Sequence, residues 1–247
     1  MAQLLDTINR LMNNLYLWLN IGTVLFPVIL SFDKKVAFYK NFKFLFPAIL
    51  ITGIFFLIWD QWFTDMNVWG FNSIHLVGYF IGDIPIEEVM FFVTVPYACL
   101  FIYECLIAYI GRSEVFEKLY RWFTLLAFGI TVSMLYWFND RLYTGITCLI
   151  LSFMLGTHLV IIKRRYMSWF FFAFAISIIP MFIVNGILTA KPVVVYNNLE
   201  TMNIRIGTIP VEDFFYNMTL LLMNIGLYEW FKRLGLRNQL RRQKQSS

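Results

Sequence analysis

The sequence predicts an all-α integral membrane protein of about seven transmembrane helices, arranged as two parallel three-helix repeats joined by a linker helix. Of its 247 residues, 60% are hydrophobic and only 14% are charged, and the mean hydropathy is +0.66. Soluble domains carry about 25% charged residues. The apolar runs show no alternation, which favours helices over an outer-membrane barrel. A third observation, an internal repeat, sets the arrangement of the helices.

Seven apolar segments are long enough to cross a hydrocarbon core, which takes about 20 helical residues. In chain order they are residues 15–31, 44–62, 86–110, 119–138, 142–162, 169–189 and 211–231. No small-residue cleavage pattern follows the first segment, so we expect no cleavable signal peptide.

Basic residues predict the orientation of the chain. Of the 20 Lys and Arg residues, 16 follow the first, third, fifth and last segments, which leaves Arg10, Arg141, Lys191 and Arg205 on the other side. The positive-inside rule then places the N-terminus outside and the C-terminus in the cytoplasm of a multi-pass protein of the cell membrane. The pI of about 9.1 indicates this topology and contact with anionic membrane lipids. We expect no nucleic-acid partner.

The repeat relates two parts of the chain at an offset of 125 residues. Residues 58–104 align with 183–229 without a gap, and the identities gather on Gly, Pro, Asn, Glu and Tyr. The unmatched fourth segment makes the two copies parallel. The predicted domains are a first repeat at 1–112, a linker helix at 113–140, a second repeat at 141–235 and a basic tail at 236–247. Transporters also use such repeats, so this layout alone assigns no function.

A short acidic phrase occurs in both repeats. It reads Gly82-Asp83-Ile84-Pro85-Ile86-Glu87-Glu88 and then Gly207-Thr208-Ile209-Pro210-Val211-Glu212-Asp213. Each copy opens an apolar segment, and ionisable groups there are costly and are functional candidates by default. The four carboxyls that follow the prolines, Glu87, Glu88, Glu212 and Asp213, are expected to leave at least one protonated at neutral pH and able to donate a proton. The alternative is that these acids only cap helices and loop amides.

Other polar and aromatic residues fall at the same membrane level. Asp60 lies near the outer end of the second segment, and its repeat partner is Asn185, which suggests that the halves have specialised. The alternative is a residue that reaches toward the headgroups. Trp59, Trp62 and Trp69 offer faces to a cation or belong to an interfacial belt. In the last segment, three polar side chains lie within about 40° on a helical wheel and should face the interior: Asp213, Asn217 and Asn224.

The chain lacks several motifs of cofactor and metal chemistry. It has no dinucleotide-binding glycine pattern, no P-loop, no H-E-x-x-H and no Asp-rich pair for magnesium diphosphate. Its three cysteines have no C-x-x-C spacing. We therefore expect no cofactor and no metal site.

These residues carry a resemblance to a known family. The doubled Pro-x-Glu-Glu/Asp phrase, the Trp59-Asp60 pair and the three-one-three layout resemble the heterodimeric-type lycopene beta-cyclases in their fused, single-chain form. The resemblance covers nearly the whole chain. The second copy departs from the first at Asp213 and at Asn185, which leaves open whether the second half is catalytic or supporting.

The resemblance implies conversion of linear lycopene ends to β-ionone rings, giving γ- or β-carotene by non-redox acid–base chemistry through a carbocation. It implies Glu87 or Glu88 as proton donor, and Glu212, Asp213 and Asp60 as base or counter-charge. It implies substrate-binding or orienting roles for six further residues: Trp59, Trp62, Asn72, Asn185, Asn197 and Asn217. The implied partners are a lipid-soluble carotenoid and membrane lipids, with carotenoid-pathway enzymes or a second copy of the chain as candidates.

Three alternatives stay open. The first is cyclisation or hydration of another carotenoid, and the second is a small transporter with the same three-one-three layout. A transporter needs matched helix breaks near mid-membrane, whereas Pro96 and Pro180 do not correspond between the repeats. A purely structural subunit is the third alternative, and the doubled acids disfavour it.

Overall fold

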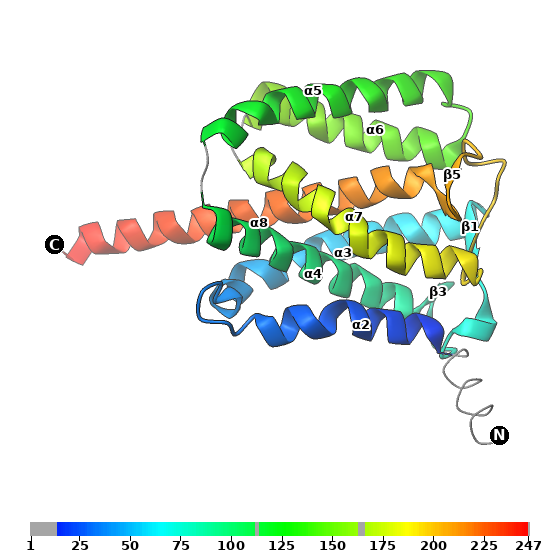
Figure 1. The fold of residues 1–247 in the computed structure, drawn as a ribbon, viewed down its shortest axis with the longest axis horizontal. Helices are drawn as coiled ribbons and strands as arrows, with labels where there is room; N and C mark the ends of the chain where they lie inside the picture. The colour runs from blue at the N-terminus through cyan, green and yellow to red at the C-terminus, as the bar shows by residue number, and fades with distance from the viewer. Residues whose placement is uncertain (1–13, 112–113, 163–165, 247) are drawn as a thin grey trace.

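The computed structural model of the protein describes residues 14–111, 114–162 and 166–246. Seven α-helices lie side by side in this part of the chain (Figure 1): α2 (Leu15–Leu30), α3 (Phe42–Asp65), α4 (Ile86–Ile110), α5 (Glu114–Trp137), α6 (Leu142–Thr157), α7 (Tyr166–Ala190) and α8 (Val211–Ser246). The predicted all-α fold is therefore confirmed. Arg10, Arg112 and residues 163–165, which contribute to the predicted charge asymmetry, lie outside the described residues, as do the junction at 112–113 and the first 13 residues.

By length and composition, five helical segments among the described residues can cross a membrane: Phe38–Asp65, Ile86–Ile110, Leu119–Trp137, Leu142–Ile162 and Tyr166–Ala190. The first expected span, α2, has 16 residues and is about 24 Å long at 1.5 Å per residue, which is shorter than a core of about 30 Å. The last, α8, carries acids in its first turn and continues as a helix to Ser246, through most of the predicted tail.

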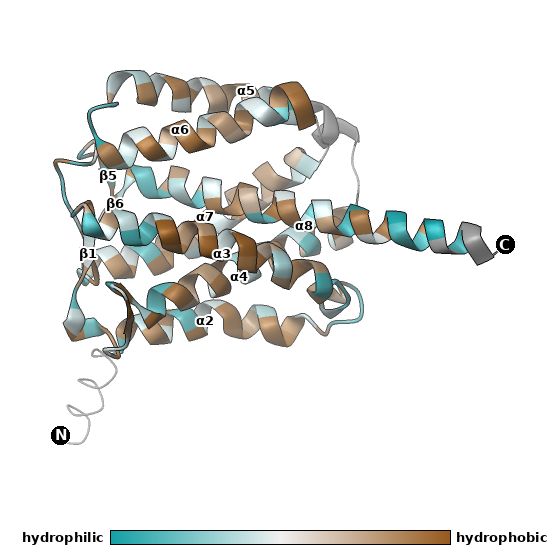
Figure 2. Ribbon diagram, turned by 180° about the vertical axis from the view of Figure 1, so that it is seen from behind, coloured by the Kyte–Doolittle hydropathy of each residue, from teal (hydrophilic) through white to brown (hydrophobic). Residues whose placement is uncertain are grey.

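The outer surface of the bundle is apolar. Large exposed side chains such as Leu50, Ile58, Phe153 and Ile179 point away from the interior, and Figure 2 shows hydrophobic residues along most helices and hydrophilic ones toward the C-terminal end of α8. A soluble monomer rarely exposes contiguous apolar surface on this scale. The protein is therefore a multi-pass membrane protein.

The two halves are related by an approximate two-fold axis, and a strand pair marks it. Strands β1 (Trp69–Phe71) and β4 (Val194–Tyr196) pair antiparallel, with Gly70 opposite Val195 at the centre. These two residues are repeat equivalents, so the pairing is symmetric. Two further backbone bonds are reciprocal: the Asn72 amide donates to Val193 O at 2.9 Å, and the Asn197 amide donates to Val68 O at 2.8 Å.

The opposite end of the bundle repeats this reciprocity with side chains. The Tyr103 hydroxyl of α4 donates to Glu229 of α8 at 3.0 Å, and the Tyr228 hydroxyl of α8 donates to Glu104 of α4 at 2.7 Å. Lys232 forms an ion pair with Glu104 at 2.7 Å. The helices α4 and α8 are thus joined across the two-fold axis near their C-terminal ends.

Both acidic phrases fold as a short hairpin that leads into a helix. Strands β2 (Phe80–Ile81) and β3 (Ile84–Pro85) pair before α4, and β5 (Arg205–Ile206) and β6 (Ile209–Pro210) pair before α8. These strands were not predicted from the sequence. Their turns depend on Gly82 and Gly207, with φ of 64° and 66°, a backbone region that costs other L-residues roughly 1–2 kcal/mol.

We expect Gly82→Ala to destabilise the protein more than Gly207→Ala. A Cβ at Gly82 would lie 2.5 Å from Gln61 Oε1, whereas a Cβ at Gly207 meets nothing within 4 Å. Gln61 is also held, because it accepts from the Asp83 amide and donates to the Asp83 carboxylate. Both variants incur the same backbone strain of roughly 1–2 kcal/mol, and only Gly82→Ala adds a clash. Unfolding midpoints in detergent micelles measure both, and equal losses would contradict the clash.

Candidate active site

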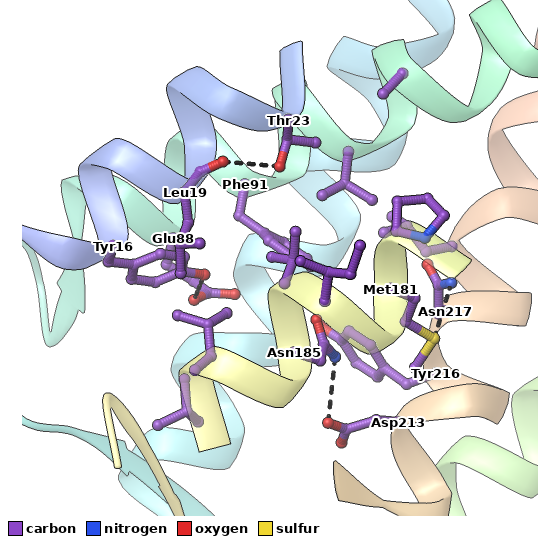
Figure 3. A pocket seen from close by; sticks show the side chains of 18 of the residues that line it. Tyr16, Leu19, Thr23, Glu88, Phe91, Met181, Asn185, Asp213, Tyr216 and Asn217 are labelled. Atoms are coloured by element: carbon purple, nitrogen blue, oxygen red, sulfur yellow. Dashed lines mark hydrogen bonds between the residues drawn. The ribbon is translucent and has the colours of Figure 1, made fainter. Parts of the chain in front are cut away.

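A cavity of about 420 Å³ lies among α2, α4, α7 and α8, with β1 and β4 at one end. Most of its wall is apolar, and three carboxyl side chains line its buried part: Asp60, Glu88 and Asp213. Figure 3 shows Glu88 beside Tyr16 and Asp213 beside Asn185, with Met181 and Asn217 farther along the cavity. When both members of either pair, Asp60 and Glu88 or Glu88 and Asp213, are ionised, their negative charges repel each other. The three acids thus form one electrostatic unit.

Glu88 lies in the first turn of α4 and is bound from α2. The buried Tyr16 hydroxyl donates to Glu88 Oε2. A second contact fixes the same two helices, because Asn20 donates to the Glu87 backbone oxygen at 2.9 Å and accepts from Thr94 at 2.6 Å. The position of the Glu88 carboxyl is therefore set by two neighbouring contacts of α2.

Asp213 occupies the equivalent position in α8 and accepts three hydrogen bonds. The Tyr143 hydroxyl donates to Oδ1 at 2.8 Å, while the Tyr196 hydroxyl and the Asn185 amide donate to Oδ2 at 2.9 and 3.3 Å. Burial and the charge of Asp213 raise the pKa of Tyr196 well above its usual value, so this phenol stays protonated and donates. The Tyr143 contact is the counterpart of the Tyr16 contact to Glu88.

Asp60 reaches the cavity from the C-terminal part of α3. Trp69 Nε1 donates to its Oδ1 at 2.7 Å. Its Oδ2 is buried and has no hydrogen-bond partner among the described residues. Asn185, the repeat equivalent of Asp60, lines the same cavity and donates to Asp213. The two equivalent positions thus meet at one site, one with a carboxyl and one with an amide.

The first acid of each Pro-x-Glu-Glu/Asp motif, Glu87 or Glu212, lies elsewhere. Glu87 and Glu212 are buried but do not line the cavity. The Val77 amide donates to Glu87 Oε1, and the Met202 amide donates to Glu212 Oε1, ten residues upstream in each case. Thr144 also donates to Glu212 Oε1 at 2.7 Å. These two acids hold the loops that precede their helices.

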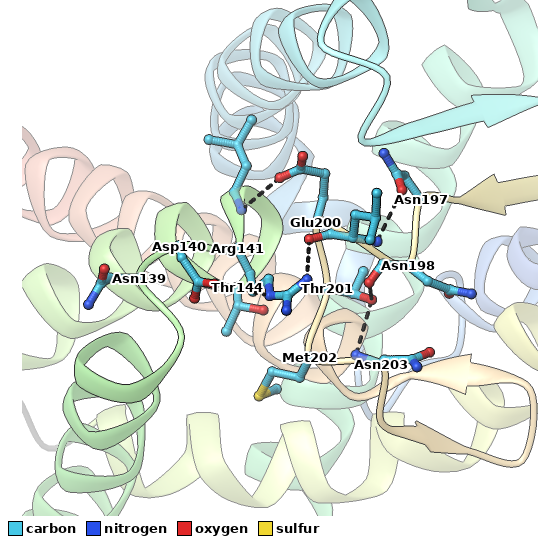
Figure 4. A network of polar contacts seen from close by, with 12 residues as sticks. Asn139, Asp140, Arg141, Thr144, Asn197, Asn198, Glu200, Thr201, Met202 and Asn203 are labelled. Atoms are coloured by element: carbon cyan, nitrogen blue, oxygen red, sulfur yellow. Dashed lines mark hydrogen bonds and ion pairs between the residues drawn. The ribbon is translucent and has the colours of Figure 1, made fainter.

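The loop before α8 has further anchors (Figure 4). Arg141 donates to the Leu199 backbone oxygen at 2.7 Å, and the Leu142 amide donates to Glu200 Oε2 at 3.1 Å. The loop is therefore fastened to the start of α6, next to Tyr143. This explains how Tyr143 and Tyr196 come to meet at Asp213.

Of the six predicted substrate-binding residues, Asn185 and Asn217 line the cavity and the other four do not. Trp59 is buried behind the wall, with its ring 5.0 Å from that of Tyr216, and Trp62 is 43% exposed. Asn72 and Asn197 accept from the amides of Ile74 and Leu199 and so stabilise the two loops.

The tyrosines of the site were not predicted from the sequence. Tyr16, Tyr143, Tyr196 and Tyr216 all line the cavity. One signal was present: Tyr16 and Tyr143 are each the second residue of the first helix described in their half. Matched polar aromatic residues at matched helix starts indicate equivalent contacts.

The fold and the cavity define a class: a multi-pass membrane protein with carboxyl groups buried at one end of an apolar pocket. The Lycopene cyclase family matches residues 13–106 and 140–231, which together make up most of the chain and fall in its two repeats. The protein belongs to the lycopene cyclase family, and it is an enzyme of carotenoid biosynthesis that acts on a lipid-soluble substrate in the membrane. Neither the curated proteins nor the solved structures contain a match.

Proposed function

We propose that the protein converts the linear ends of lycopene into β-ionone rings, giving γ- and then β-carotene without net oxidation or reduction. The observation that carries this proposal is the cavity itself, in which three buried carboxyls meet an apolar wall. An acid, a base and a water-poor pocket are what a protonation-initiated cyclisation requires.

The reaction adds one proton to the substrate and later removes one proton from the ring. A carboxylic acid protonates the terminal double bond and leaves a tertiary carbocation. The neighbouring double bond attacks it, which forms the new carbon–carbon bond of a six-membered ring and moves the positive charge. A base then removes a proton to leave the ring double bond, so the formula of the hydrocarbon is unchanged.

We assign the donor role to Glu88 and the role of base and counter-charge to Asp213. Glu88 lines the cavity and accepts one side-chain hydrogen bond, from Tyr16, so it can carry the proton that it donates. Asp213 accepts three hydrogen bonds, an arrangement suited to a carboxylate. Asp60 supplies a second counter-charge near the cation.

Aromatic faces complete the electrostatics of the site. Tyr16, Trp69, Phe91 and Tyr216 line the same cavity as the three acids. Aromatic faces attract cations, most strongly where water is absent. The rings therefore support the carbocation without adding a nucleophile to its carbon, and the apolar wall limits hydration, which would give an alcohol in place of a ring.

We also propose the orientation and the domain plan. Lys232, Arg233 and Arg237 follow the apolar part of α8, which favours a cytoplasmic C-terminus in the cell membrane. The acids then lie near the outer face. The three-helix repeats at 1–112 and 141–235 would be two halves of one enzyme, with 113–140 as the linker.

Pigment chromatography of a lycopene-accumulating bacterium that expresses the chain tests the function. Formation of γ- or β-carotene supports the proposal. Unchanged lycopene beside a well-expressed, membrane-inserted protein contradicts it. A hydroxylated acyclic carotenoid would instead favour hydration of the same double bond, because water would then have captured the cation.

A further inference from the structure

The cavity extends from the buried acids to the outer surface of the bundle. Three of its lining residues are widely exposed: Trp18 and Phe26 of α2 are 49% and 68% exposed, and Ile183 of α7 is 59% exposed. Helices α2 and α7 share few contacts with each other, whereas α2 packs closely on α4. The cavity therefore opens sideways between α2 and α7.

The two-fold axis predicts an equivalent opening between α3 and α6, and aromatic rings occupy it. At the offset of 125 residues, the cavity-lining Met181, Val184 and Leu188 of α7 correspond to Phe56, Trp59 and Phe63 of α3. Those three rings are buried in the core. Phe56 and Trp59 both pack on Tyr216, with ring centroids 5.1 and 5.0 Å away.

We propose that one end of the linear polyene enters the site sideways from the lipid, through the opening between α2 and α7, and that Phe56 and Trp59 close the equivalent route. This inference rests on the proposed function and adds its access route. A long apolar hydrocarbon dissolves in the lipid core, so a lateral opening spares it from crossing water. The polyene would then lie in the opening while its end meets the acids.

The opening between α2 and α7 contains a position where a larger side chain could block entry without displacing neighbouring atoms. Gly22 of α2 lines the cavity, and a Cβ built there meets nothing within 4 Å. A large side chain at residue 22 would therefore occupy the opening. Gly129 of α5 gives a matched control, because it is also an exposed helical glycine with nothing within 4 Å, and it does not line the cavity.

The experiment compares Gly22→Ala, Gly22→Leu and Gly22→Phe with Gly129→Phe in lycopene-accumulating cells. Two quantities are measured: ringed carotenoid per unit of membrane-inserted protein, and carotenoid that co-purifies with the protein in detergent. We expect both to fall as residue 22 grows, with at least a tenfold loss of ringed product for Gly22→Phe. Gly129→Phe should match the wild type.

The outcomes separate the access route from the function. Wild-type activity in Gly22→Phe, or an equal loss in Gly129→Phe, would overturn the route while leaving cyclisation intact. A wild-type protein that forms no rings but retains carotenoid would overturn the function, and the co-purified amounts would still test the route. A wild-type protein that does neither would overturn both.

Discussion

Glu88→Gln is expected to lower ring formation by about 10²- to 10⁴-fold, the range over which a positioned acid or base contributes to catalysis. The glutamine keeps the size of the side chain and still accepts the hydrogen bond from Tyr16. It has no acidic proton to give to the double bond. The measurement is the amount of γ- and β-carotene relative to lycopene, normalised to membrane-inserted protein.

Glu87→Gln is the matched control for this prediction. Glu87 is the neighbouring residue and is also buried, but its Oε1 accepts from the Val77 amide and its side chain does not line the cavity. A glutamine oxygen can accept the same bond, so we expect activity within a few-fold of the wild type. A larger loss in Glu87→Gln than in Glu88→Gln would reverse the assignment of the donor.

Asp213→Asn is the second large effect that we expect, with a loss of about 10²-fold or more. The substitution removes the negative charge that faces the carbocation. It also places an amide donor where the side chain now accepts bonds from Tyr143, Tyr196 and Asn185. Product analysis in the same cells gives the loss, and the unfolding midpoint in detergent checks that the fold persists.

Glu212→Gln is the matched control for Asp213→Asn. It tests whether a carboxylate must line the cavity to affect the rate of ring formation. Glu212 is adjacent to Asp213 and accepts from Met202 and Thr144, outside the cavity. A glutamine can keep both bonds, so the rate should change little. Equal and large losses in Asp213→Asn and Glu212→Gln would contradict the assignment of Asp213 as base and counter-charge.

Continuous hydrophobicity and local signals predicted the helices well. The segment expected at 86–110 is observed as α4 with the same bounds, Ile86–Ile110, because Pro85 marks its start and the apolar run is unbroken. The polar stripe of α8 is also confirmed, since Asp213, Asn217 and Asn224 are all buried. These features depend on residues close in sequence, whose helical geometry is fixed.

Features that depend on long-range packing could not be predicted in the same way. The two-residue strands follow from the turns at Gly82 and Gly207 and leave too short a pattern to detect. Glu87 and Glu88 differ by about 100° around one helix, so only the neighbouring elements decide which one reaches the cavity. Tyr16 meets Glu88 across 72 residues, and only its match with Tyr143 at the start of the corresponding helix distinguishes it among 13 tyrosines.

The pairing of the buried acids has a consequence for biogenesis. The polar partners of Glu88 and Asp60 lie in the first half of the chain, and those of Asp213 and Glu212 lie in the second. Among the acids that the structure describes, Glu104 and Glu229 are the ones that accept side-chain hydrogen bonds from the other half. A nascent first half can thus leave the translocation channel with Glu88 and one oxygen of Asp60 already hydrogen-bonded, before α8 is synthesised. Joining the halves late in translation then costs little desolvation, and the same autonomy would let each half be made as a separate polypeptide.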